Sequence, residues 1–103
     1  MSAILTEKEF SQHLNTNFLV DVDAAQPIEL ELVEVKSYES KANEQAGLER
    51  FSLFFSGPAE FLLPQHTYAF THDKLGKFDI FIVPIGRGER GCRYEAVFNY
   101  KKE

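Results

Sequence analysis

Short runs of alternating apolar and polar residues fill the second half of the chain and constrain its fold more than any other feature. The clearest are Phe51-Ser52-Leu53-Phe54-Phe55-Ser56 and residues 94–100, and compact turn residues such as Gly57-Pro58 interrupt the pattern. A period near two is typical of half-buried strands, whose apolar faces must be covered by one another. The pattern therefore predicts an antiparallel β architecture, but it specifies no chemistry.

The same periodicity predicts the other elements. Thr6-Glu7-Lys8-Glu9 fits a capping box, and Leu5 and Phe10 fit a hydrophobic staple, so we expect a short helix over residues 7–14 that docks on an apolar surface. Gly76 can supply the positive φ of a tight hairpin turn. The strands are expected at residues 18–22, 28–36, 51–56, 67–72 and 77–83, and from residue 92 or 93 to residue 100.

The alternation slips once. Ile28, Leu30 and Leu32 share one face of the second strand, whereas Val33 and Val35 fall on the other by count. A slip of one residue moves every later side chain across the sheet unless a bulge absorbs it, so the sequence predicts a bulge at Leu32-Val33.

Residues 38–50 are polar and have no strand pattern, although residues 42–48 are compatible with a weak helical turn. This stretch is either a mobile loop or the functional one. No crossover helices separate the strands, which disfavours a parallel α/β fold. We therefore expect a mainly β protein: an antiparallel meander forming a small barrel or sandwich of about six strands, with one short N-terminal helix.

Length and composition predict the number of domains and the cellular compartment. A chain of 103 residues, 44% of them hydrophobic, predicts a single domain over residues 1–103. The one cysteine, Cys92, cannot form an internal disulfide, and Glu7, Lys8 and Glu9 stand where a signal peptide needs an apolar run. These features favour a soluble protein in a reducing compartment, the cytoplasm, without membrane association.

Charge disfavours nucleic-acid binding, because the net charge is −5 and an acidic domain repels a phosphate backbone. The charge is uneven. Residues 1–50 hold 4 basic and 10 acidic residues, whereas residues 51–103 hold 7 and 6. Such an asymmetry can orient a partner or simply keep a small protein soluble.

Five segments of the chain form a recognisable pattern: Phe51-Ser52-Leu53-Phe54-Phe55-Ser56-Gly57-Pro58, Leu63-Pro64-Gln65 with Thr67-Tyr68, His72 with Leu75-Gly76, Phe81-Ile82-Val83-Pro84-Ile85-Gly86, and Tyr94-Glu95-Ala96-Val97-Phe98-Asn99. On these segments the chain resembles a small bacterial family known only as a domain of unknown function, and the likeness runs from Leu5 to Asn99. The resemblance implies a domain-sized unit of unassigned activity, with members encoded near phage-tail-like collar proteins and hence a role in assembly. It implies no catalytic residue.

The strongest candidate for function is residues 86–91, a predicted loop with three glycines. Glycine-rich backbone can expose successive N–H groups, and Arg87, Arg90 and Arg93 can meet an anion or an acidic protein surface. The segment lacks the Lys-Ser/Thr ending and the helix of a nucleotide-binding loop. The simpler interpretation is a hairpin loop with solvated arginines.

Three aromatics are candidates for the same partner surface. Phe54, Phe81 and Tyr100 lie by count opposite the residues expected to fill the core. Exposed together they would form an apolar patch of the kind found at interfaces, although burial under the helix or the long loop explains them equally well.

The other reactive residues favour structural roles. His66 and His72 share one face of a strand about 20 Å apart, and no cysteine or carboxylate cluster completes a metal site with them or with His13. Cys92 has no strand–elbow–helix context and fits a small apolar filler. We expect no catalytic residues, no metal and no cofactor.

These observations favour a non-enzymatic protein-interaction or assembly module, phage-tail-like if the resemblance extends that far, with an unidentified protein partner or a second copy of the chain. The alternative is a small-ligand-binding β-barrel whose inward aromatics line a cavity. The ten Phe and four Tyr count against it, because in so short a barrel they fill the interior.

Overall fold

The computed structural model describes residues 6–23, 26–38, 47–88 and 91–101. Within them the strands form one antiparallel ring in the order β1-β2-β3-β6-β5-β4. This confirms the mainly β fold of six antiparallel strands, although the ring is not a regular barrel. The elements are α1 (Glu7–Ser11), β1 (Asn17–Asp21), β2 (Ile28–Ser37), β3 (Leu48–Gly57), β4 (His66–His72), β5 (Gly76–Gly88) and β6 (Gly91–Lys101).

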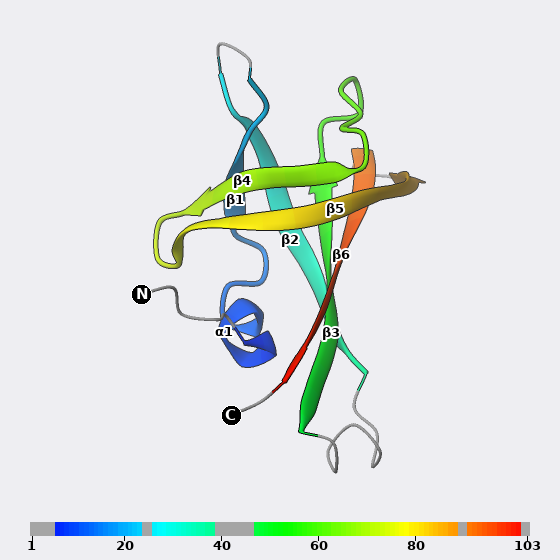
Figure 1. The fold of residues 1–103 in the computed structure, drawn as a ribbon. Coiled ribbons are helices and arrows are strands. Elements are labelled where there is room, and N and C mark those ends of the chain that lie inside the picture. The colour runs from blue at the N-terminus through cyan, green and yellow to red at the C-terminus, as the bar shows by residue number, and fades with distance from the viewer. Residues whose placement is uncertain (1–5, 24–25, 39–46, 89–90, 102–103) are drawn as a thin grey trace.

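Two strands, β2 and β5, each belong to two layers of the ring. Residues 28–31 of β2 pair with β1, and residues 31–37 pair with β3. In β5, residues 76–82 pair with β4 and residues 83–88 with β6. Figure 1 shows the result: β4 and β5 cross β3 and β6 steeply. In such orthogonal packings the corners are made by strands that switch sheets.

A break in register lies at each corner. In β2, Leu32 pairs with Phe55 and Glu34 with Phe54, so Val33 is the extra residue and the predicted bulge is confirmed. The bulge returns Val35 to the core-facing row of the strand. A second register shift between Pro84 and Gly86 in β5 was not predicted. Bulges bend a strand and increase its twist, which closes the ring.

Aromatic rings fill the interior. Phe18 packs edge-on against Phe55, Phe70 and Phe78, with centroid distances of 5.5, 6.3 and 6.2 Å. Fully burying one such side chain contributes about 1.5–3 kcal/mol, so this aromatic cluster stabilises the fold. The fully buried core also includes Val20, Leu30, Leu32, Phe51, Leu53, Ile82, Cys92 and Tyr94.

Helix α1 covers the end of the ring where β5 and β6 diverge. Its capping box is formed: Glu9 N–H donates to Thr6 Oγ1, and Thr6 N–H donates to Glu9 Oε1, both at 3.2 Å. Phe10 is fully buried, with its ring centroid 5.9 Å from Phe78 and 5.5 Å from Phe98. The expected docking on an apolar surface is thus confirmed. Leu5, the other half of the predicted staple, lies outside the described residues.

Several predicted boundaries are wrong. The helix ends at Ser11 rather than Leu14, and the chain then turns through Asn15, whose φ is +66°. The third strand begins at Leu48, and most of the long segment before it lies outside the described residues. The predicted glycine loop is mostly strand, because β5 continues to Gly88 and β6 begins at Gly91.

The expected meander is also wrong in one connection. After β3 the chain crosses the ring, and β4 pairs with β1 and β5 rather than with β3. Tyr94 anchors this crossing, because Leu63 N–H donates to its hydroxyl at 2.8 Å and that hydroxyl donates to Phe61 O at 3.3 Å. Among the described residues, no helix is long and apolar enough to cross a membrane.

Replacing Phe10 tests whether the packing of α1 stabilises the end of the ring where β5 and β6 diverge. Phe10→Ala removes a fully buried ring from three aromatic neighbours, so we expect a loss of about 3–5 kcal/mol in the free energy of unfolding, measured by urea denaturation. Leu19→Ala, at a side chain 42% exposed, is the control and should cost less than about 1 kcal/mol. Equal losses in the two variants would contradict a packing role for α1.

Candidate functional site

The outward face of β2, β3 and β6 brings together one predicted aromatic and one predicted arginine. Phe54 points outward from β3, between Glu34 on β2 and Glu95 on β6. Arg93 lies two residues before Glu95 on β6 and therefore on the same face. We call Glu34, Phe54 and Arg93 the Arg93 surface.

Arg93 is held in place by its two neighbours. Its guanidinium lies 5.9 Å from the centre of the Phe54 ring, and its Nη2 lies 3.9 Å from Glu34 Oε1. The Arg93 and Glu34 side chains are 40% and 55% exposed, so the ion pair orients the arginine and adds only about 0–1 kcal/mol of stability. Among the described residues, its buried Nε–H has no hydrogen-bond partner. The surface therefore presents an arginine lying over an aromatic ring.

The glycines beside Arg93 have structural roles. A side chain at Gly88 would begin 3.1 Å from Arg93 Cδ, so Gly88 leaves room for the arginine stem. Gly86, directly opposite Arg93 in the ladder, has a φ of +130°, which favours glycine. Gly91 has a φ of +121°, and a Cβ there would collide with the Gly57 carbonyl. These structural roles explain the glycines without an anion-binding loop.

The second bulge separates the predicted arginines. Because Ile85 is the extra residue, Gly86 pairs with Arg93 and Arg87 with Cys92, so Arg87 and Arg93 lie on opposite faces of the hairpin. Arg90 lies outside the described residues. The expected arginine cluster is thus not formed by Arg87 and Arg93.

A shallow groove of about 300 Å³ lies beside the Arg93 surface. Ser52 forms the floor of the groove, because it is smaller than the outward-facing residues on either side of it. The Ser52 hydroxyl donates to Glu95 Oε2 at 2.8 Å. The groove is lined by Tyr38, Arg50, Ser52, Glu95 and Val97. Sequence reasoning missed this feature, although the alternation of Arg50, Ser52 and Phe54 on one face of β3 could have indicated it.

The other two predicted aromatics do not join this surface in the described structure. Phe81 is 49% exposed but pairs with Thr67, on the half of β5 that belongs to the β4 layer. Tyr100 pairs with Glu49 through its backbone, and its side chain lies outside the described residues. Phe54 alone of the three is placed beside Arg93.

His72 forms a buried polar network. Its Nδ1 accepts N–H donors from Lys74 at 3.0 Å and Leu75 at 3.3 Å, which places the proton on Nε2, 2.9 Å from Thr16 Oγ1. The Thr16 hydroxyl donates in turn to His13 O at 2.6 Å. His72 therefore fastens the β4–β5 turn to the segment between α1 and β1.

The remaining reactive side chains contact a neighbouring residue or lie apart from one another. Cys92 is buried with Sγ 3.7 Å from Ala59 O, and His66 is exposed with its ring against Tyr68. No three His, Cys, Asp or Glu side chains converge on a common point within the described ranges.

The His72 network predicts a loss of stability in mild acid. Burial first, and the neighbouring His13 second, lower the pKa of His72 below its ordinary value of 6.5, while Asp73 acts in the opposite sense and Lys74 adds to the lowering. Near pH 6.5 the unfolded chain therefore binds a proton at His72 that the folded chain does not bind. The free energy of unfolding should therefore fall as the pH drops from about 7 to 5.

A titration of variants tests this assignment by urea denaturation at each pH. His72→Asn keeps an acceptor near the two backbone amides but does not titrate, so it should flatten the pH dependence. His66→Asn, at an exposed histidine, should keep the wild-type slope. A wild-type slope in His72→Asn would show that another group causes the acid sensitivity.

The comparisons with known proteins give one family. The family model described as "Domain of unknown function (DUF6916)" matches residues 5–98. No curated protein and no solved structure matches the chain.

Proposed function

We propose that this chain, which belongs to the DUF6916 family of domains of unknown function, is a non-enzymatic module that binds a protein partner. The observation that carries the proposal is the Arg93 surface with its adjoining groove. Arginine and aromatic side chains are enriched at protein interfaces and at their energetic centres. Here the Arg93 guanidinium already lies against Phe54 and Glu34, and this order lowers the entropy cost of binding.

The groove indicates the chemistry of the partner. Arg50 is exposed at its side, whereas the Glu95 carboxylate is engaged by Ser52 and the Glu34 carboxylate lies against Arg93. Val97, 61% exposed, and Tyr38 provide apolar walls. A protein surface that presents a carboxylate beside an apolar side chain complements this arrangement.

A non-enzymatic role agrees with the state of the reactive groups. Cys92 is buried against the Ala59 carbonyl, and both ring nitrogens of His72 are engaged. Neither is presented to a substrate as a nucleophile or a base. The net charge of −5 favours a protein over a nucleic acid as the partner.

A phage-tail-like assembly is the more specific form of this proposal, and its support is the family resemblance alone. The alternative, a small-ligand-binding barrel, has less support, because the inward positions hold aromatic rings in mutual contact. Cytoplasmic location and the absence of a membrane role remain part of the proposal.

Site-specific crosslinking tests the surface. A photoreactive phenylalanine analogue at position 36, on the outward face of β2, should crosslink to a partner in the native host. The same analogue at position 19, on the outward side of β1, should not. Equal yields from the two positions, or no product from position 36, would contradict the proposal.

Charge reversal tests the partner chemistry in the same assay. Arg50→Glu places a carboxylate against the partner's carboxylate, so we expect the yield from position 36 to fall at least about tenfold. Arg87→Glu makes the same charge change on the opposite face of the hairpin and should leave the yield unchanged. The pair of variants therefore also tests the sequence prediction that Arg87 contacts a partner.

A further inference from the structure

We propose that the C-terminal half of β6 pairs in antiparallel fashion with the same segment of a second copy of this chain. The inference goes beyond the proposed function, because it concerns the edge of the sheet and not its outward face. It rests on three observations: an unpaired strand edge, the lack of protecting charges along that edge, and the pairing that two-fold symmetry produces.

The edge exists because β5 leaves β6 early. Strand β3 pairs with β6 from Cys92 to Lys101. Strand β5 follows β6 only as far as Glu95, because from residue 82 toward its N-terminus it pairs with β4. Within the described residues, positions 96–99 of β6 therefore have a strand neighbour on the β3 side alone. In Figure 1 the lower half of β6 runs apart from β5.

Within the described ranges, this edge also lacks the protection that strand edges usually have. Natural sheets guard open edges with charged side chains, prolines or bulges. The opposite edge of this layer, in β2, has the Leu32–Glu34 bulge and the outward charges of Glu34 and Lys36. In β6 the outward residues at positions 97 and 99 are Val97, 61% exposed, and Asn99. Of the two edges, β6 is the one open to a further strand.

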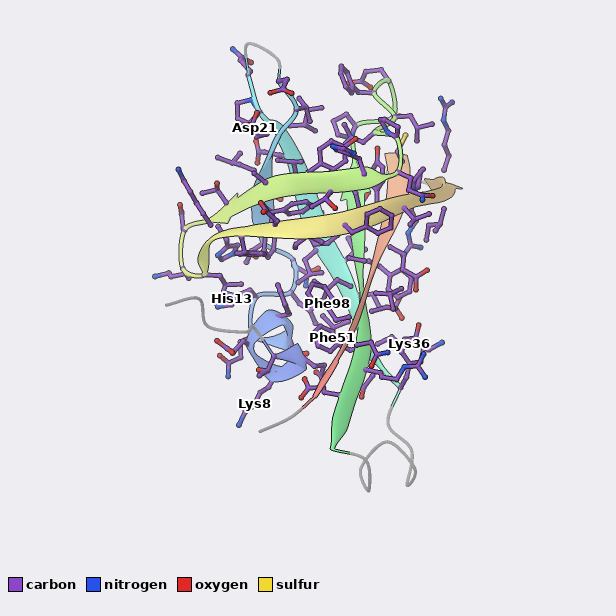
Figure 2. All side chains as sticks on the ribbon, viewed as in Figure 1. Lys8, His13, Asp21, Lys36, Phe51 and Phe98 are labelled. Atoms are coloured by element: carbon purple, nitrogen blue, oxygen red, sulfur yellow. The ribbon has the colours of Figure 1, made fainter. Side chains whose placement is uncertain are left out.

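A second copy fits this edge by symmetry. An antiparallel pair of identical strands is self-complementary about a two-fold axis. An axis at Phe98 sets Phe98 opposite Phe98 of the second copy and Val97 opposite Asn99. Phe98 is only half-buried, although its ring stacks on Phe51 with centroids 4.8 Å apart and planes 3° apart. Figure 2 shows these two rings together below β4 and β5.

The net charge of the chain and the small size of the contact together set the strength of this pairing. The chain carries a net charge of −5, so copies repel one another in general, but positions 96–99 carry no charge. An axis at Phe98 pairs residues 97–99 of the two copies, and a contact of about three residues per strand is small, so the dimer should be weak and depend on protein concentration. The pairing would join the two β2–β3–β6 layers into one continuous sheet.

The test is the mass measured by light scattering over a concentration series. We expect the wild-type chain to move from monomer toward dimer between about 10 and 500 µM, and Val97→Lys to weaken the association at least about tenfold. The matched control is Leu19→Lys, at a side chain 42% exposed on a strand paired on both edges, and it should dimerise like the wild type.

A charge pair tests the register. In the double variant Val97→Lys, Asn99→Glu, the two-fold axis at Phe98 places opposite charges across the interface, so dimerisation should recover relative to Val97→Lys. In Val97→Lys, Asn99→Lys, like charges face each other, and the chain should stay monomeric. Arg50→Glu should leave the dimer intact, which separates this inference from the proposed function.

A wild-type chain that is monomeric up to about 500 µM would overturn the inference. Equal loss of dimer in Val97→Lys and Leu19→Lys would also overturn it, because the contact would then not be specific to the β6 edge. A folded Val97→Lys variant that dimerises like the wild type would place the contact elsewhere and overturn it as well.

Discussion

The change of partner by β5 between Ile82 and Val83 determines most of the structure. Up to Ile82 the strand belongs to the β4 layer, and from Val83 it belongs to the β6 layer. Together with the change of partner in β2, this transfer closes the ring of strands, and it separates β5 from the second half of β6. Phe10 fills the space that results, and in the part of the chain that the structure describes no strand lies beside β6 beyond Glu95 on the side away from β3.

The bulge next to that transfer also shapes the candidate surface. With Ile85 as the extra residue, Gly86 pairs with Arg93, Gly88 leaves room for its stem, and the guanidinium reaches over Phe54 toward Glu34. The interior and the outward face thus serve different purposes. The interior is occupied by packed rings that stabilise the fold, whereas the outward face has an ordered arginine and a groove. The partner binding that we propose at that face would require no change in the core.

Local patterns in the sequence predict local structure well. The period of two located all six strands, the Thr6–Glu9 capping box located the helix, and the slip at Leu32-Val33 located a bulge, because each depends on neighbouring residues. The extent of β5 was missed because Pro84 and Gly86 are typical of turns. The candidate site depends on register between distant strands. By simple alternation Arg87 would share a face with Arg93, and the bulge at Ile85 reverses this.

Amide hydrogen exchange along β6 tests the central claim, that β5 leaves the second half of this strand unpaired on the side away from β3. In a dilute sample, all amides of residues 92–95 should be protected by strands on both sides. In residues 96–99, only alternate amides, those directed at β3, should be protected, and the others should exchange at least about a hundredfold faster. Uniform protection of residues 96–99 in the monomer would contradict the account, because another part of the chain would then cover the edge.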